Sequence, residues 1–513
     1  MSDSDSDLQI AESMAKAADA GELYAASVSR SGGTVLALSR KDDEKLLLVG
    51  CPADTYPGAA RRFTGDELAT DGDVPVLFKL CRPSPVNAEA LRALLHWTAP
   101  RLGGTEPAAG LGDRLGLATP GHVRAVSGSG VLPFLAQQSI REMERTGRDP
   151  QKVMDSASWG VFEAGWRGGF GSDADHLKRT EDIDWCLEAG FTMFTIDPGD
   201  HVADEADSED AAKLAERLPA LPWDGLEATE ADLRLRYVGR EFVLPGPGGD
   251  VAVSFDEETF LRAAVKYGRA VAHVVQLARH LESKAPQRTT ELEMSVDETA
   301  SPTSTAEHYF VAAELCRLGV TPVSLAPRFV GEFEKGIDYK GDLDLFRARF
   351  AEHVAVARRF GPYKISLHSG SDKFSVYPIC AELAAGMVHL KTAGTSYLEA
   401  LRVICEIERD LFCEILEFAH ERYDEDKRTY HVSADPAVVP HADGASDDEL
   451  RSTLDTDDGR QLLHVTYGSV LTADGGERFR PRIISALKAN EERHYEALAS
   501  HIGRHVSPFV RPE

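Results

Sequence analysis

The sequence predicts an α/β fold, a (β/α)8 TIM-like barrel with an N-terminal α/β flanking region and insertions. First, apolar β-type runs alternate with amphipathic helical stretches after about residue 119, as in a parallel sheet whose strands are joined by helices. Second, these runs are apolar on both faces, as strands covered by helices must be. Third, there are roughly eight of them, which favours a closed barrel over an open sheet. An open dinucleotide-binding sheet would also need a G-x-G-x-x-G after a strand, and the sequence has none.

Changes in composition set the expected domain boundaries. Two stretches interrupt the barrel pattern because they are acidic or rich in Pro and Gly. The expected segments are a flexible acidic N-terminus at 1–20, an N-terminal α/β flanking region at 21–118, a barrel at 119–500 with insertions at about 202–288 and 438–460, and a C-terminal tail at 501–513. The expected barrel strands are VLPFLAQQS, FTMFTIDPG, TTELEMSVDE, VTPVSLAP, YKISLHSG, MVHLKTAG, TYHVSADP and LLHVTYGSV.

The formal net charge is −28, from 84 acidic and 56 basic residues, and such a surface repels nucleic acid and anionic membranes. Only 16 of the basic residues are Lys, and excess carboxylate with little Lys favours a halophilic source over an ordinary acidic protein. The chain starts without a basic or apolar signal region, and no apolar run is long enough to span a membrane. Its seven scattered Cys include no C-x-x-C. We therefore expect a cytoplasmic protein with reduced thiols, and an oligomer is compatible with the sequence.

Polar residues gather where the expected strands end, and these ends form the catalytic face of a barrel. Asp175 and His176 lie in GSDADHLK, Asp297 and Glu298 follow LEMSV, and His368 follows KISL. Imidazoles with carboxylates suit a catalytic divalent metal, while Lys and Ser/Thr suit an anionic, hydroxylated ligand such as a sugar acid. No Ser nucleophile elbow, phosphate loop or HExxH is present. The residues alone therefore predict a barrel enzyme that uses a metal or binds a sugar acid.

Structural roles remain open for several of these residues. Asp175 could cap the helix that follows it, a role that Thr180 could also fill. Glu334 and Lys335, in the loop after VSLAP, could form a solvated pair. Asp197, before Pro-Gly, could be a turn residue.

Five longer segments have an unusual composition, and they are FGSDADHLKRTEDI, APRFVGEFEKGIDYKGDL, YKISLHSGSDKFSVYP, VHLKTAGTSYLEALR and LLHVTYGSVL. They span roughly residues 130–490. Together they resemble the tagaturonate epimerase family, the uronate epimerases of hexuronate breakdown. The resemblance implies interconversion of D-tagaturonate and D-fructuronate with a divalent metal cation, whether Mn, Fe, Co, Ni or Zn.

The resemblance also implies roles for particular residues. The implied metal ligands are His176, Glu334 and His368, and the implied proton-transfer pair is Asp175 and Glu298. The implied substrate-binding residues are Lys335, Ser369, Ser371, Lys373 and Lys391.

The two sugar acids differ at the carbinol carbon β to the ketone, so simple enolisation does not invert it. A retro-aldol route does: a base takes the proton of the β-hydroxyl, the carbon–carbon bond breaks, and the aldehyde fragment re-adds on its other face. Direct proton transfer at that carbon is the alternative route. The alternative functions are another metal-dependent sugar-acid aldolase or keto-sugar isomerase on the same barrel, or a non-catalytic sugar-acid binding protein.

Overall fold

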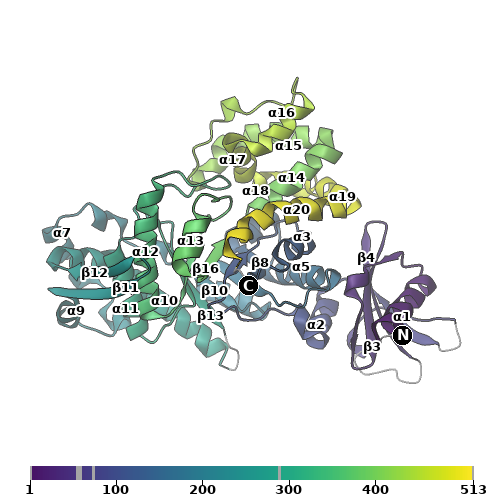
Figure 1. The fold of residues 1–513 in the computed structure, drawn as a ribbon, viewed down its shortest axis with the longest axis horizontal. Coiled ribbons are helices and arrows are strands. Elements are labelled where there is room, and N and C mark those ends of the chain that lie inside the picture. Colours follow the sequence, from purple (N-terminus) through teal and green to yellow (C-terminus); the bar gives the residue numbers. More distant parts are fainter. Residues whose placement is uncertain (1–2, 53–59, 72–74, 287–289, 511–513) are drawn as a thin grey trace.

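The computed structural model describes residues 3–52, 60–71, 75–286 and 290–510. An eight-stranded barrel lies between an N-terminal sheet, purple in Figure 1, and an insertion, teal in Figure 1. The C-terminal helices, green to yellow, lie above the barrel in this view. In this described part of the chain, no helix combines the length and the apolar character needed to cross a membrane.

The N-terminal sheet is antiparallel and has the strand order β1-β3-β4-β6-β5, with β2 beside β3. Its central strand β3 (Thr34–Lys41) is largely buried on both faces, because successive side chains point to opposite sides. One face packs against helix α1 (Asp3–Ala17) and the other against helix α2 (Pro85–Leu94). The remaining strands are β1 (Glu22–Leu23), β2 (Ser29–Ser31), β4 (Glu44–Pro52), β5 (Asp66–Ala69) and β6 (Val76–Cys81).

The helix α1 occupies most of the segment for which the sequence predicts a flexible acidic N-terminus, 1–20. Ala11, Met14 and Ala15 recur at helical spacing and are buried against the sheet. Burial of such a stripe stabilises a helix that would be marginal by itself. The expectation of flexibility was therefore wrong for residues 3–17.

The predicted closed barrel is confirmed, with the strand order β7-β8-β9-β10-β13-β14-β15-β16 and parallel pairing throughout. The strands are β7 (Ala108–Gly110), β8 (Leu132–Ser139), β9 (Gly171–Leu177), β10 (Met193–Ile196), β13 (Glu291–Val296), β14 (Ser324–Pro327), β15 (Lys364–Leu367) and β16 (Val388–Lys391). The helices between them are α3 (Thr119–Val126), α4 (Ile140–Thr146), α5 (Pro150–Glu163), α6 (Thr180–Glu188), α10 (Glu257–Lys284), α11 (Thr305–Arg317), α12 (Leu343–Phe360) and α13 (Tyr377–Ala384).

Two of these strands were not expected from the sequence. The strand β7 has three residues and lies within the range 21–118, so the barrel begins before residue 119. The strand β9 reads GSDADHL, and Gly, Ser and Asp are typical of loops rather than strands. The carboxylates of Asp173 and Asp175 pair with the buried Lys391 inside the barrel. These contacts stabilise polar residues that a strand seldom contains.

Two expected strands are not strands. TYHVSADP lies largely outside regular structure, and LLHVTYGSV lies in the helices α17 (Asp457–Val465) and α18 (Tyr467–Thr472). Thr456 caps α17 by accepting a hydrogen bond from the N–H of Gly459. A short apolar run cannot be assigned to strand or helix by periodicity alone. Here the cap at Thr456 favours the helix.

The described part of the expected insertion at 202–288 contains three short α-helices and a hairpin, followed by the long helix α10. The hairpin packs against α11 and α12, where the rings of Phe242 and Tyr309 are stacked with centroids 4.5 Å apart. The elements are α7 (Ala211–Arg217), α8 (Trp223–Leu226), α9 (Glu230–Tyr237), β11 (Arg240–Gly246) and β12 (Gly249–Phe255).

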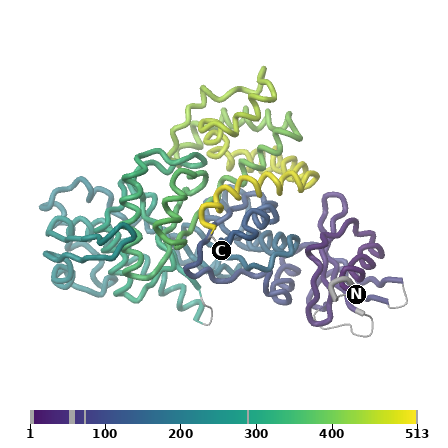
Figure 2. The backbone as a smooth tube through the Cα atoms, viewed as in Figure 1, coloured from purple at the N-terminus to yellow at the C-terminus, as the bar shows by residue number. Residues whose placement is uncertain are grey.

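After β16 the described chain contains helices and no strand, and these helices form a second apolar core. The acidic range 438–460 is therefore not simply a loop, since it contains the capped helix α16 and the start of α17. Residues 501–506 are not a tail either, because α20 continues through them and packs on α3 and α14, as Figure 2 allows the reader to follow. The elements are α14 (Thr395–Ile407), α15 (Arg409–Asp426), α16 (Asp447–Ser452), α19 (Arg480–Ala489) and α20 (Glu491–Val506).

Candidate active site

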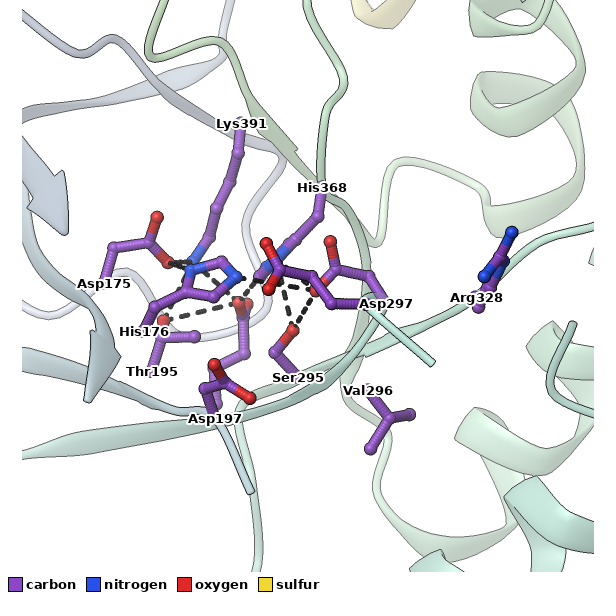
Figure 3. A network of polar contacts seen from close by, with 12 residues as sticks. Asp175, His176, Thr195, Asp197, Ser295, Val296, Asp297, Arg328, His368 and Lys391 are labelled. Atoms are coloured by element: carbon purple, nitrogen blue, oxygen red, sulfur yellow. Dashed lines mark hydrogen bonds and ion pairs between the residues drawn. The ribbon is translucent and has the colours of Figure 1, made fainter. Parts of the chain in front are cut away.

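The ammonium group of Lys391, at the end of β16, lies among three buried carboxylates in the barrel (Figure 3). Its Nζ is 2.7 Å from Oδ1 of Asp175, 2.9 Å from Oδ2 of Asp173 and 2.8 Å from Oε1 of Glu293. It also donates a hydrogen bond of 2.8 Å to the hydroxyl of Thr195. Burial alone would lower the pKa of Lys391, but the three carboxylates raise it well above its usual value. Lys391 therefore holds the cluster together as a permanent cation.

Two imidazoles complete the cluster, and their ring centroids are 5.0 Å apart. His368 follows β15, and its Nε2 is 2.7 Å from Oε1 of Glu293 while its Nδ1 is 3.1 Å from Oδ1 of Asp297. His176 lies in β9, with Nδ1 2.9 Å from Asp175 and Nε2 3.6 Å from Asp297. Both rings therefore face carboxylate oxygens in a buried region.

The backbone of β9 is irregular at His176. Its φ of +54° is in the left-handed region, which costs a residue with a Cβ roughly 1–2 kcal/mol. The pairing register between β9 and β10 shifts at the same place, between Phe194 and Ile196. Such bulges re-aim side chains at barrel rims. Here the bulge lets Asp175 and its chain neighbour His176 both contact the cluster.

The donor set fits a divalent metal ion. Ligand atoms of Asp175, His176 and His368 all lie within 4.8 Å of one another. Two imidazoles with one carboxylate and open positions are a donor set used for first-row divalent metals. Within the described residues, Nε2 of His176 is buried and has no hydrogen-bond partner. A carboxylate oxygen of Asp297 approaches both rings, which makes Asp297 a further oxygen donor.

The third implied metal ligand, Glu334, lies elsewhere. One of its carboxylate oxygens accepts hydrogen bonds from the N–H and hydroxyl of Ser433, at 3.0 and 2.6 Å, and from the amide of Gln461 at 2.7 Å. Glu332 and Lys340 pair across the same loop, so the segment forms a small hairpin that directs Glu334 toward the C-terminal helices. Glu334 thus joins the loop after β14 to those helices, and its assignment as a metal ligand with His176 and His368 is corrected.

The implied proton-transfer pair is divided by the structure. Asp175 belongs to the buried cluster and also accepts a hydrogen bond of 3.1 Å from the amide of Gln137. Glu298 lies at the rim, where its side chain is 47% exposed and pairs with Arg141 at 3.4 Å. The neighbouring Asp297, which sequence reasoning did not select, contacts both imidazoles instead.

A cleft of about 610 Å³ opens above the cluster and adjoins a second of about 960 Å³. Arg141, Lys335 and Ser369 line both clefts, so the two are continuous. The first cleft is lined by Arg114, Gln137, Ser139, Arg141, Glu142, Asp175, His176, Lys335, Gly336, His368, Ser369, Ser371, Lys391, Ala393, Gly394, Tyr430 and His464.

The expected substrate-binding residues divide between cleft and scaffold. Lys335, Ser369 and Ser371 line the cleft. Lys391 also lines it, but its ammonium group is held by three carboxylates.

Lys373 does not reach the cleft: its buried Nζ donates to the carbonyls of Glu334 and Ser371, at 2.7 and 2.9 Å, and of Ile337. Burial lowers the pKa of Lys373 to about 7. Lys373 therefore joins the loop after β15 to the loop after β14, and its assignment as a substrate-binding residue is corrected.

Two groups of site residues received no functional role from the sequence. Asp173 and Glu293 lie inside strands, and a charged residue within a buried strand was an available signal for them. Arg114, Arg141 and His464 come from the loop after β7 and from helices α4 and α17. Nothing local in the sequence marks these three residues, because only the fold brings them to one cleft.

A closed parallel barrel with a buried cluster of imidazoles, carboxylates and lysine at the ends of its strands defines a barrel enzyme. Comparisons with known proteins narrow this class. A family profile described as tagaturonate epimerase matches residues 24–509. A tagaturonate/fructuronate epimerase of Thermotoga maritima is 42% identical over 485 residues, which are 94% of this chain and 96% of that protein. The chain therefore belongs to the tagaturonate epimerase family and is an isomerase, as its resemblance to that family implied.

Crystal structures of a fructuronate-tagaturonate epimerase from Cohnella laeviribosi have the same fold. The native structure has a TM-score of 0.87 and the structure with two glycerol molecules a TM-score of 0.89, both at 36% identity. Each comparison covers 98% of this chain, and they cover 99% and 100% of the respective crystal chains. The similarity thus extends over the flanking sheet and the C-terminal helices as well as the barrel.

Proposed function

We propose that this protein interconverts D-tagaturonate and D-fructuronate in hexuronate catabolism. The observation that carries the proposal is the buried carboxylate and imidazole cluster beneath a cleft lined by cations and hydroxyl groups, in a chain 42% identical to a protein named for that reaction. The substrate is accordingly a small sugar acid. The net charge of −28 supports a protein without nucleic-acid or anionic-membrane partners. We also propose that the protein works in the cytoplasm.

The proposal includes a divalent metal cation, such as Mn, Fe, Co, Ni or Zn. His176 and His368 would hold it together with a carboxylate of Asp175 or Asp297. When bound, the metal supplies a Lewis acid that polarises oxygen atoms of the substrate.

The chain's own residues would move a proton and hold the fragments in a retro-aldol route. A base takes the proton of the β-hydroxyl, the bond between the α and β carbons breaks, and its electron pair stays on the ketone fragment as an enolate. The aldehyde turns, the same bond re-forms on its other face, and the proton returns, so atoms and electrons balance. The proposed proton carrier is whichever of Asp175 and Asp297 does not hold the metal, and Glu298 is the secondary candidate because it lies at the rim, half exposed and paired with Arg141.

The test is an NMR time course of purified protein with either sugar acid and Mn²⁺, Co²⁺ or Ni²⁺, against an EDTA control. We expect the other epimer to appear only with metal, and His368→Ala to abolish its appearance. His280→Ala is the matched control, because His280 pairs with Asp184 away from the cleft. No epimer under any metal would contradict the proposal, and two separate fragments would indicate an aldolase.

The route has its own test. With tritium on the epimerised carbon, the retro-aldol route keeps the label on the sugar, because only the hydroxyl proton is transferred. Washout of tritium into water at the rate of turnover would overturn the retro-aldol route and indicate direct proton transfer at carbon.

A further inference from the structure

One wall of the cleft contains buried polar atoms that have no hydrogen-bond partner among the described residues. Arg114 is 5% exposed, and its Nε and Nη2 donate to Oε1 of Glu142 at 3.0 and 2.8 Å. Its guanidinium carbon lies 3.5 Å from the ring centroid of Tyr467, which fixes the plane of the group. Its remaining nitrogen, Nη1, is buried without a hydrogen-bond partner among the residues that the structure describes. A buried donor left in this way is available to an acceptor oxygen of a ligand that enters the cleft.

His464 lies on the same wall and is 2% exposed. In the described part of the chain neither of its ring nitrogens has a hydrogen-bond partner. Burial, with the positive charges of Arg114 and Lys335, holds the pKa of His464 well below its usual value. His464 is therefore neutral at physiological pH and offers one N–H donor beside two cations.

The helix α14 begins at this wall. Ala393 and Gly394 line the cleft, and no side chain caps the start of the helix. The first N–H groups of a helix have no partner within it and carry partial positive charge. A Cβ on Gly394 would lie 1.9 Å from Cε1 of His464, so only glycine lets the imidazole pack against the helix start. Helix start, imidazole and guanidinium therefore converge on one part of the cleft.

We propose that this wall, formed by Arg114, Lys335, His464 and the first turn of α14, binds the carboxylate of the sugar acid. It would thereby select uronates over neutral ketohexoses. The other lysines near the cleft do not fill this role, since Lys391 is held by carboxylates and Lys373 by carbonyls. The identity of the sugar acid rests on the proposed function, but the assignment of a carboxylate subsite does not need turnover.

The wall has a consequence for the reaction. In a retro-aldol step the carboxylate stays on the aldehyde fragment, so a fixed carboxylate keeps that fragment in the cleft while its aldehyde group turns. Charge-assisted hydrogen bonds to a buried guanidinium are strong enough to retain such a fragment.

The test is calorimetric binding of D-gluconate, D-glucitol and inorganic phosphate, with and without Mn²⁺. Gluconate and glucitol differ only in the terminal carboxylate, and neither has the ketone that the reaction requires. We expect gluconate to bind about tenfold or more tightly than glucitol. We expect Lys335→Met and Arg114→Met each to remove most of this difference while glucitol binding changes by less than about twofold.

Matched controls are Lys340→Met, in the same loop as Lys335, and Arg148→Met, a buried arginine bonded to backbone carbonyls. Lys335 is only half buried, so Lys335→Met decides the matter even where Arg114→Met does not fold. Unchanged gluconate binding in Lys335→Met would overturn the proposal, as would phosphate binding more tightly than gluconate. If the protein shows epimerase activity but gluconate binding is unchanged in the variants, only the carboxylate-binding wall is refuted. If gluconate binding falls in the variants but no epimerase activity is found, only the proposed epimerase function is refuted.

Discussion

In the loop after β15, Oδ1 of Asp372 lies 2.7 Å from Nε2 of His501 in helix α20. The N–H of Asp372 donates to Nε2 of His505 at 2.9 Å, and its Oδ2 is 2.9 Å from Arg460 of α17. The C-terminal helices therefore fix a loop that carries Ser371 into the cleft. Asp372, His501 and His505 also lie close enough together to hold a metal ion, but their mutual hydrogen bonds account for their arrangement.

Asp372→Asn is expected to destabilise the protein by about 3–5 kcal/mol at neutral pH, because it breaks a buried charge network. Burial alone would raise the pKa of Asp372, but the hydrogen bond from His501 and the charge of Arg460 hold it well below its usual value. Its stabilisation is therefore complete above the unfolded pKa of about 4 and is lost as pH falls below that value. Urea unfolding from pH 7 to 3 should show the gap to wild type narrowing in acid. The exposed Asp424→Asn is the control, and a constant gap would contradict the account.

Asp297→Asn is expected to lower kcat by about 100-fold or more, because Asp297 contacts both imidazoles of the cluster. Glu298→Gln should lower it by less than about tenfold if Glu298 acts mainly through its rim pair with Arg141. Parallel kinetics and circular dichroism of the two variants check this order. Equal or reversed losses would restore Glu298 as the more important carboxylate.

Lys364→Met is expected to stabilise the protein at pH 7 by up to about 3 kcal/mol. Lys364 starts β15 at the opposite end of the barrel, and its buried Nζ has no hydrogen-bond partner among the described residues. Burial lowers its pKa to about 8, so the cost of keeping it charged applies fully below pH 8 and fades toward pH 10. The urea midpoint of the variant should exceed that of the wild type at pH 7, and the difference should be smaller at pH 10. A less stable variant at pH 7 would mean that Lys364 has partners that outweigh its burial.

The halophilic source predicted from composition is also open to measurement. Screening relieves repulsion within a chain of net charge −28, but it is nearly complete at about 1 M salt, where the Debye length is about 3 Å. A halophilic protein should continue to gain stability in KCl above that concentration. Thermal unfolding from about 0.1 to 3 M KCl tests this, and a maximum at low salt would exclude halophilic adaptation.

The sequence was a good guide to the barrel where strands are apolar and poor where they carry function. β13, β14 and β15 were found because buried parallel strands read as apolar runs bounded by turns. β9 was missed because its residues serve the cluster and violate strand preferences. LLHVTYGSV was misassigned because its apolar residues pack in a helical core, which a short run does not reveal.

The candidate site was predictable only in part, for a related reason. His176 and His368 follow from their places near strand ends, and the structure brings them together. Glu334 met the same criterion, but a local hairpin turns it away, and no sequence pattern signals that turn. Arg114 and His464 are 350 positions apart, so their meeting is a property of the fold and not of any segment.

The attachment of the loop after β15 to α20 sets an order of events during synthesis. Ribosomes deliver the chain from its N-terminus, so all eight barrel strands emerge well before His501 and His505. Until then Asp372 lacks both of its imidazole partners, and the loop that carries Ser371 lacks its contacts with α20. We therefore expect a nascent chain to be able to close its barrel before the loop after β15 has gained its contacts with α20.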